Sequence, residues 1–341
     1  MTGTAAAFAA SLERLAPDLA LVEEAMREQL ASPSELVALL GRHVLGSGGK
    51  RMRPALLLVA AELCGYTGPR RIQLAAAIEL IHTATLLHDD VVDLSELRRG
   101  RPSANALWGN RRAVLAGDFL YARSSAMIVE DGNPDILWIF ADAIRQMAEG
   151  ELLQLEKSFD PEISESHYFA VIERKSAILL AAACEIGSIP GGVTRAERRK
   201  LAEYGRELGI AFQLRDDALD YSAGEEALGK PRHGDLREGK VTLPLLLTVK
   251  RCTPAEREQI GAVLKNAQQL ELLGPDADEA RASLDLEPVL SLVARYRGVE
   301  DSMRRAHQHA ARSAAAIAPF PDGRAKEDLL AAVHYTVSRD H

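Results

Sequence analysis

The sequence contains few of the residues that stabilise small secreted or zinc-dependent folds. Only three of its 341 residues are cysteines, and aromatic residues make up 5% of the chain. Cys64, Cys184 and Cys252 are too few for a disulfide framework and lack the spacing of a zinc site. We therefore interpret them as buried, unreactive thiols of a protein that folds in a reducing compartment.

Long apolar runs and an excess of basic residues are also missing. A membrane-spanning helix needs about 18 or more apolar residues in a row, and no segment approaches that length. The first residues, MTGTAAAFAASLERL, have no basic group before their apolar stretch, unlike a secretory signal. The formal net charge of −8 argues against nonspecific binding to nucleic acid. We expect a cytoplasmic protein without a nucleic-acid partner and with at most transient membrane contact.

Strand patterns are scarce, whereas helix-forming residues are abundant. Ala, Leu, Glu and Arg dominate, and apolar residues recur with the helical period. Hydrophobic residues make up 47% of the chain, without a linker rich in proline or serine. The sequence therefore predicts one all-α domain over residues 1–341. Helices are expected at 8–28, 34–45, 54–66, 71–97, 110–130, 134–157, 164–188, 195–222, 241–250, 254–268, 285–319 with a break near Gly298, and 323–338.

One long polar gap interrupts this helical pattern. The segment SAGEEALGKPRHGDLREGK, residues 222–240, is rich in glycine and in basic residues. A segment of this length and composition is either a disordered surface loop or a lid that closes over a site. Its own sequence leaves both interpretations open.

Two aspartate clusters share the spacing DDxxD, the first in LIHTATLLHDDVVD and the second in GIAFQLRDDALDY. On a helix, the first and last aspartates of each motif share one face, where unpaired carboxylates repel one another. A single copy is most simply a solvated acidic turn. Two copies, each ending a mostly apolar stretch, indicate carboxylates that meet at a cavity and need cations. The six residues are Asp89, Asp90, Asp93, Asp216, Asp217 and Asp220.

Magnesium fits these carboxylates better than the other common metals do. It binds carboxylate oxygens, keeps part of its water shell and often shares its ligands with substrate phosphates. An EF-hand calcium site is excluded, because neither copy has the alternating D-x-D-x-D-G pattern or a glutamate at the twelfth position. Zinc would need a set of histidines and cysteines that neither copy provides.

A metal-bound phosphate also needs cationic side chains, and the sequence supplies them beside flexible backbone. GSGGKRMRP places Lys50, Arg51 and Arg53 between a glycine-rich loop and a proline suited to the first turn of a helix. This spacing differs from the Walker A phosphate loop, and the segment is also compatible with a solvated surface. His82 lies two helical turns before Asp89, so it either faces the same cavity or is a hydrogen-bonded core residue.

Several motifs, taken in order and spacing, resemble a known family. GGKRMRP, LIHTATLLHDDVVD, LRRGRPSANALWGN, AVLAGDFLYAR, AEGELLQLE, ERKSAILL, GIAFQLRDDALDY and LGKPRHGDLREGKVTLP are similar to trans-polyprenyl diphosphate synthases, in particular the bacterial octaprenyl diphosphate synthases. The resemblance implies an isoprenoid synthase helical bundle with a central cavity and a homodimer. It also implies a magnesium-dependent prenyltransferase, which condenses isopentenyl diphosphate with an allylic diphosphate, expected to be farnesyl diphosphate.

The resemblance further implies a role for each matching residue. Asp89 and Asp93 bind two magnesium ions with support from Asp90, and Asp216 binds a third with help from Asp217 and Asp220. The diphosphate of isopentenyl diphosphate is bound by Lys50, Arg53, His82 and Arg99. The allylic diphosphate is bound by Arg98, Lys175, Lys230 and Lys240. Ser176 and Gln213 form a polar pair facing the allylic centre.

Two positions depart mildly from the family pattern. Ser176 stands where the family usually has threonine, but it keeps the hydroxyl group. His233-Gly234-Asp235 replaces a commoner acidic pair, so that only Asp235 remains to support metal-bound water. Neither change indicates an inactive enzyme. Because the segment 222–240 carries two of the lysines with an implied role, the resemblance favours its interpretation as a lid.

Product length is expected to depend on the residues one turn before the first aspartate cluster. In this family, bulky aromatics there stop the growing chain early, whereas Ala84 and Thr85 are small. The resemblance therefore implies a long channel and a product of about eight isoprene units. Candidates for the channel floor are Phe119, Tyr121, Met127 and Met147, which are equally compatible with plain core positions.

Four other interpretations remain to be weighed. A class I terpene cyclase shares the first motif but normally has an Asn/Ser/Glu pattern in place of the second, and it needs no basic pocket. A geranylgeranyl diphosphate synthase would differ only in product length. A noncatalytic subunit of a heteromeric synthase, or a helical scaffold with acidic faces, would incorporate no isopentenyl diphosphate as an isolated chain.

Overall fold

The computed structural model describes residues 3–31, 34–46, 51–98, 100–222, 233–277, 280 and 283–338. Within these residues the chain is almost entirely helical, which confirms the all-α prediction. Strands occur there only as the antiparallel pair β1 (Leu97–Arg98) and β2 (Arg101–Pro102). None of the helices in this part of the chain has both the length and the hydrophobicity that crossing a bilayer requires.

The longer helices of the first half are α1 (Gly3–Gln29), α2 (Glu35–Gly46), α3 (Met52–Leu63), α4 (Arg70–Val92), α6 (Asn110–Asp131) and α7 (Pro134–Glu156), with the short α5 (Ala104–Trp108) before α6. Those of the second half are α8 (Glu165–Ile172), α9 (Ile178–Ser188), α10 (Arg195–Ser222), α13 (Leu243–Val249), α14 (Pro254–Leu272), α16 (Glu287–Arg295), α17 (Gly298–Ala316) and α18 (Arg324–Ser338). Shorter turns are the π-helical segment Glu173–Ala177, the 3-10 turns Ile189–Gly191 and Gly274–Ala277, and α12 (Gly234–Arg237).

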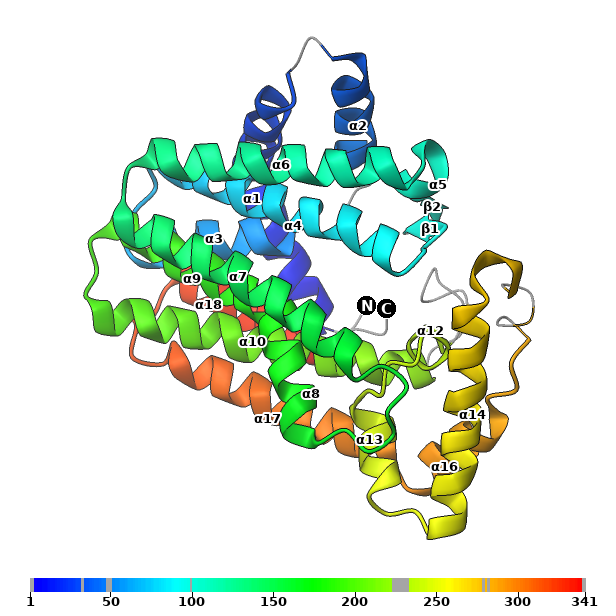
Figure 1. Ribbon diagram of the computed structural model, residues 1–341. Helices are drawn as coiled ribbons and strands as arrows, with labels where there is room; N and C mark the ends of the chain where they lie inside the picture. Colours follow the sequence, from blue (N-terminus) through cyan, green and yellow to red (C-terminus); the bar gives the residue numbers. More distant parts are fainter. Residues whose placement is uncertain are drawn as a thin grey trace.

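The helices form a bundle in which α10 is a central element. It packs along α9 on one side and along α17 on another, while α4 packs along α6 (Figure 1). Helices α14 and α16 stand at one side of the bundle, beyond α12 and α13 (Figure 1). The main core is lined by fully buried side chains such as Leu57, Ile78, Leu80 and Tyr204. This packing brings the C-terminal halves of α4 and α10 to the same end of the bundle.

Helix α10 approaches the π-helical segment at backbone distance because it has a glycine at the contact. A Cβ atom added at Gly209 would lie 2.5 Å from the Cα atom of Ala177, closer than real atoms approach. A larger residue would therefore push the two helices apart. The contact lies one turn before Gln213 and directly after Ser176, so it sets how near these two side chains come.

Most predicted helices agree with the structure to within a few residues, including the predicted break near Gly298. The predicted helix 71–97 was wrong at its end. Helix α4 stops at Val92, Leu94 has a left-handed backbone (φ 50°), and the β1–β2 hairpin follows. The predicted helix 164–188 is interrupted by the π-helical segment, which the sequence pattern did not reveal because a one-residue insertion changes the apolar periodicity very little.

A buried ion-pair cluster joins α10 to α17 and gives a test of the fold. Glu207 is only 5% exposed, and its Oε2 atom accepts hydrogen bonds from His309 Nδ1 and Arg312 Nε, both at 2.8 Å. Burial alone would raise the pKa of Glu207, but these partners outweigh it and lower the pKa to about 2. Protonating or neutralising this carboxyl therefore removes an interaction that stabilises the folded state.

We predict that Glu207→Gln lowers the free energy of unfolding at pH 7 by about 1 to 3 kcal/mol, because it weakens two charge-assisted hydrogen bonds. The carboxyl's folded pKa lies below its ordinary 4.5, so its stabilisation is present above pH 4.5 and is lost as the pH falls toward 2. Urea denaturation followed by circular dichroism should show the wild-type advantage shrinking over that range.

The matched control for this prediction is Glu203→Gln, on the same helix but in an exposed pair with Lys200. It should change the stability by less than about 0.5 kcal/mol at any pH. Equal destabilisation by the two substitutions would contradict the assignment of Glu207 to a stabilising cluster.

Candidate active site

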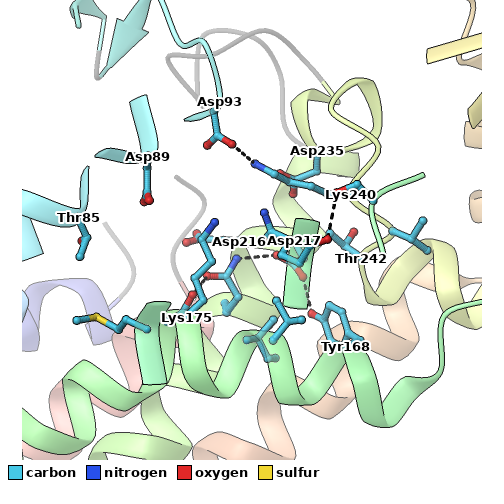
Figure 2. Close-up of a pocket in the computed structure, with 18 of the residues that line it drawn as sticks. Thr85, Asp89, Asp93, Tyr168, Lys175, Asp216, Asp217, Asp235, Lys240 and Thr242 are labelled. Carbon is cyan, nitrogen blue, oxygen red and sulfur yellow. Dashed lines mark hydrogen bonds and ion pairs between the residues drawn. The ribbon is translucent and has the colours of Figure 1, made fainter. Parts of the chain in front are cut away.

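A cavity of about 350 Å³ lies where the C-terminal halves of α4 and α10 converge. Asp89, on α4, and Asp93, the residue that follows this helix, line the cavity on one side. Asp216 and Asp217 line it from α10. Figure 2 shows the two clusters facing one another across the cavity, with Lys175 and Lys240 between them. The structure therefore brings together two aspartate motifs that are far apart in the sequence.

The three aspartates of the first cluster have different environments. Asp89 faces the cavity, and burial raises its pKa to about 6, partly offset by Lys175. Asp90 is 2% exposed and accepts a 2.6 Å hydrogen bond from Arg98 Nε. Asp93 caps the end of α4 and lies 3.4 Å from Lys240 Nζ. Asp89 and Asp93 thus line the cavity, whereas Asp90 holds the start of the hairpin through Arg98.

The second cluster also contains a fully buried carboxyl, Asp217, which is 2% exposed. Burial and the Asp235 carboxylate raise the pKa of Asp217 well above its ordinary value and that of Asp220 to about 7. Asp220 Oδ1 accepts a hydrogen bond from the Gly234 N–H at 3.1 Å. Its Oδ2 atom is buried and has no hydrogen-bond partner among the described residues. A cation placed here would favour the ionised form of both carboxyls.

A chain of hydrogen bonds connects α8, α10 and the π-helical segment at the cavity wall. Ser176 Oγ donates to Gln213 Oε1 at 2.8 Å, and Gln213 Nε2 donates to Asp217 Oδ1 at 2.8 Å. The Tyr168 hydroxyl donates to the other oxygen, Asp217 Oδ2 (Figure 2). Burial and the Asp217 carboxylate raise the pKa of Tyr168 well above its usual value, so the phenol keeps its proton.

This series of hydrogen bonds contains the predicted pair Ser176 and Gln213. It also includes Tyr168, which sequence reasoning missed. Tyr168 is 4% exposed and lines the cavity from α8. In the sequence it resembles any core aromatic of an apolar helix, and no motif marks it. Only the folded arrangement shows that its hydroxyl reaches a carboxylate of the second aspartate cluster.

Lys175 is held at the cavity by α7. Its Nζ atom lies 2.5 Å from Glu151 Oε2, a second residue that sequence reasoning did not single out. The preceding residue, Gly150, allows the π-helical segment to approach, because a Cβ atom there would lie 2.7 Å from the Lys175 backbone nitrogen. The π-helical turn presents Lys175 and Ser176 to the same cavity, which is a common use of such turns at functional sites.

Lys240 links the segment after α12 to the first aspartate cluster. Its Nζ atom lies 2.6 Å from Glu238 Oε2 and 3.4 Å from Asp93 Oδ1. Burial disfavours its charge, but these carboxylates outweigh that effect and raise the pKa of Lys240. Of the predicted lid, residues 233–240 form α12 and an ordered turn with Asp235 and Lys240 at the cavity, and 223–232 lie outside the described residues.

The basic residues divide into those at the cavity and those elsewhere. Arg53 and His82 line the cavity, with Arg53 Nη1 2.9 Å from His82 Nε2, which favours the functional interpretation of His82. Arg98 also lines it, although its Nε atom is bound to Asp90. Arg51 instead pairs with the buried Glu79 and with Glu23, so the basic loop is not a uniform anion site. Lys50, Arg99 and Lys230 lie outside the described residues.

The apolar part of the cavity wall comes from several helices: it includes Leu86, Met147, Val171, Ile172 and Leu179. Thr85 lines the cavity, and its hydroxyl is bound to the His82 carbonyl at 2.7 Å. Ala84 is 2% exposed and packs in the main core. Among the floor candidates, Met147 is at the cavity, Phe119 and Met127 pack in the main core, and Tyr121 is 45% exposed.

The donor set at the cavity fits magnesium. Carboxylate oxygens of Asp89, Asp93, Asp216 and Asp217 line the cavity, and one turn beyond Asp216 on α10 the buried Asp220 Oδ2 atom has no hydrogen-bond partner among the described residues. Within the described residues, no group of three His, Cys, Asp or Glu side chains converges closely enough to hold an ion. Ions bound here would therefore need further oxygens from water or from a bound anion, as magnesium in phosphate-binding sites usually has.

Comparison with known proteins identifies the family. Residues 34–273 match the profile of the polyprenyl synthetase family. The chain is 42% identical to an octaprenyl diphosphate synthase of Escherichia coli (96% of this chain, 98% of the relative) and 34% identical to heptaprenyl diphosphate synthase component 2 of Geobacillus stearothermophilus (96% and 97%).

A solved structure agrees with these sequence matches. The crystal structure of a polyprenyl synthase from Caulobacter crescentus CB15, complexed with calcium and isoprenyl diphosphate, superposes with a TM-score of 0.89. It is 39% identical and covers 98% of each chain. The isoprenoid synthase fold expected from the motifs is thereby confirmed. The chain belongs to the polyprenyl synthetase family and is a prenyltransferase.

Proposed function

We propose that this protein condenses isopentenyl diphosphate with an allylic diphosphate, expected to be farnesyl diphosphate, in a magnesium-dependent head-to-tail reaction. The product is an all-trans polyprenyl diphosphate of about eight isoprene units. The observation that carries the proposal is that Asp89 and Asp93 of the first cluster and Asp216 and Asp217 of the second line one cavity, together with Ser176, Gln213, Lys175 and Lys240. The similarity to an octaprenyl diphosphate synthase supports the reaction and the product class.

The metal-binding role is assigned to the two aspartate clusters. Asp89 and Asp93, supported by Asp90, would hold two ions, and Asp216, assisted by Asp217 and Asp220, would hold a third. When bound, magnesium neutralises the negative charge that develops on the leaving diphosphate. The calcium and isoprenyl diphosphate bound to the polyprenyl synthase from C. crescentus support this combination of ligands.

The cationic side chains would bind the two diphosphates. Arg53 and His82, with Lys50 and Arg99, are assigned to isopentenyl diphosphate. Arg98, Lys175 and Lys240, with Lys230, are assigned to the allylic diphosphate. Lys175 and Lys240 are bound to Glu151 and Glu238, so an incoming diphosphate would compete with these carboxylates for them. The pairs keep the lysines oriented until the substrate arrives.

The polar pair would act on the allylic carbon. As the C1–O bond breaks, the electron pair leaves with the diphosphate and an allylic cation remains. Because Ser176 donates its proton to Gln213 Oε1, its oxygen lone pairs stay free to face positive charge. The isopentenyl double bond then forms the new C–C bond, and a proton from the neighbouring carbon is lost. By family resemblance the released diphosphate accepts that proton.

Product length would be set by the wall that the growing chain meets. Each added five-carbon unit buries about four CH₂ equivalents at roughly 0.8 kcal/mol each, which favours elongation into the apolar cavity. Thr85, one turn before Asp89, is small and leaves this path open. A short-chain geranylgeranyl diphosphate synthase is the alternative, and analysis of the product separates the two.

We also propose that the protein is a homodimer formed through the neighbouring helices α6 and α7. Both helices expose large apolar side chains: Leu115 (57%), Val129 (61%) and Trp138 (73%). A monomer rarely exposes several such side chains on adjacent helices, and a self-complementary face suits a two-fold dimer. The match to a protein named component 2 leaves a heteromeric, noncatalytic subunit as the alternative.

The function is tested by incubating the isolated chain with radiolabelled isopentenyl diphosphate, farnesyl diphosphate and magnesium. We predict incorporation that stops on chelation of the metal and returns when magnesium is added. Asp89→Asn and Asp216→Asn should each lower kcat by roughly 100-fold or more, because they remove charge that would bind the metal. As a control, Asp142→Asn replaces a partly buried carboxylate on α7 that pairs with Arg145 away from the cavity, and it should leave kcat unchanged. No incorporation by the wild-type chain would favour the noncatalytic subunit.

The chain-length assignment predicts that Thr85→Phe shortens the product by several isoprene units, because the ring would block the path beside Asp89. Thr85→Val, which has nearly the same volume but lacks the hydroxyl, should give the wild-type product. Thin-layer chromatography of the dephosphorylated products measures both. A wild-type product from Thr85→Phe, or a twenty-carbon product from the wild-type protein, would refute the assignment.

The dimer assignment predicts that Leu115→Arg combined with Val129→Arg converts the protein to a monomer in sedimentation equilibrium, because two charges would be buried at the interface. Leu272→Arg is the matched control, since Leu272 is 82% exposed on α14 and should leave the mass unchanged. A wild-type protein that sediments as a monomer would contradict the proposal directly.

A further inference from the structure

We infer that Tyr168 is a positioning residue for the prenyl transfer: through Asp217 it fixes the side-chain orientation of Gln213 and, in turn, the direction of the Ser176 hydroxyl. The inference rests on the proposed function of the cavity. Its basis is the geometry of one continuous hydrogen-bond chain, Tyr168 to Asp217 to Gln213 to Ser176.

The direction of each hydrogen bond in this chain is determined by chemistry. An amide N–H can only donate and the Tyr168 phenol keeps its proton, so Asp217 receives the Gln213 N–H on Oδ1 and the Tyr168 O–H on Oδ2. With its NH₂ group used on this side, Gln213 turns its oxygen toward Ser176, 2.8 Å away. Ser176 must then donate its only proton to Gln213, and its lone pairs remain for the cavity. The reversed amide would instead make Ser176 an acceptor.

Tyr168 is what keeps Asp217 from adopting another orientation. Both residues are buried, at 4% and 2% exposure, so water does not replace a missing partner easily. Without the Tyr168 hydroxyl, Asp217 Oδ2 would lose its donor and the carboxylate would be free to rotate. Gln213 would then lose the partner that selects one of its two amide orientations. The expected result is a slower chemical step with normal substrate binding.

Tyr168 lines the cavity, but its proposed role is indirect and needs no contact with the reacting atoms. Its hydroxyl donates to Asp217, and its ring packs edge-on against the ring of Phe169. The assigned diphosphate and metal ligands lie on other elements. Tyr168 therefore acts through Asp217 and Gln213, and its effect should disappear when the end of the chain, Ser176, is removed.

The first experiment measures steady-state kinetics of Tyr168→Phe with farnesyl diphosphate, isopentenyl diphosphate and magnesium. We expect kcat to fall roughly tenfold, as for loss of one charge-assisted hydrogen bond, with KM values for both substrates within about twofold of wild type. A kcat equal to that of wild type, or a loss confined to KM, would overturn the inference. An inactive wild-type protein would instead refute the proposed function.

Tyr204→Phe is the matched control. Tyr204 is also fully buried, and its hydroxyl donates to the Leu329 carbonyl at 2.8 Å, but it does not line the cavity. Removing its hydroxyl should lower stability without changing kcat. All assays are run at a temperature at which each variant keeps the wild-type near-ultraviolet circular dichroism, so that loss of folding is not mistaken for loss of catalysis. An equal kcat loss in both variants would assign the effect to general destabilisation.

A double-mutant cycle separates positioning from a general structural effect. If Tyr168 acts through the chain, Tyr168→Phe should lower kcat by less than about twofold in a protein that already carries Ser176→Ala, because the oriented group is gone. If Tyr168 has an independent role, the two losses should multiply. If the two kcat losses multiply, the inference is overturned, even if the Tyr168→Phe variant alone has a lowered kcat.

Discussion

The constraint on which the structure depends is the concentration of carboxyl groups in a buried cavity. Burial removes Asp217 and Asp220 from water, which disfavours their charged forms. The nearby Asp235 carboxylate disfavours further negative charge, so the pKa values of both carboxyls are raised. A scaffold that holds such groups together must be rigid, since the carboxyls would otherwise separate. Their charge is what makes the cavity selective for ligands that carry cations with them.

The rigidity comes from backbone contacts made possible by two glycines. Gly209 lets α10 lie directly against the π-helical segment, and Gly150 lets α7 approach the same segment from another side. The segment is thus fixed on two sides at the turn that carries Lys175 and Ser176. Side chains that act on a reactive carbon need to be placed within a fraction of an ångström, and backbone contacts provide this better than flexible side chains do.

The sequence alone was sufficient for the parts of the site that repeat or that carry charge in a pattern. Two DDxxD motifs on predicted helices located Asp89 and Asp216 on one cavity, and the helical periodicity predicted most of α1 to α18. Tyr168 and Glu151 could not be found in this way, because each is a single residue whose partner is far away in the chain. The end of α4 was missed because Leu94 adopts a left-handed backbone that leucine rarely shows.

The lysines at the cavity explain how this charge distribution is balanced before substrates bind. Lys175 is paired with Glu151 and Lys240 with Glu238, and neither carboxylate belongs to an aspartate motif. A ligand must therefore offer more negative charge than a single carboxylate to attract both lysines. A diphosphate accompanied by divalent cations meets this requirement, because it satisfies the lysines and the aspartates at once. Glu151 and Glu238 therefore hold these two lysines at the cavity in the structure.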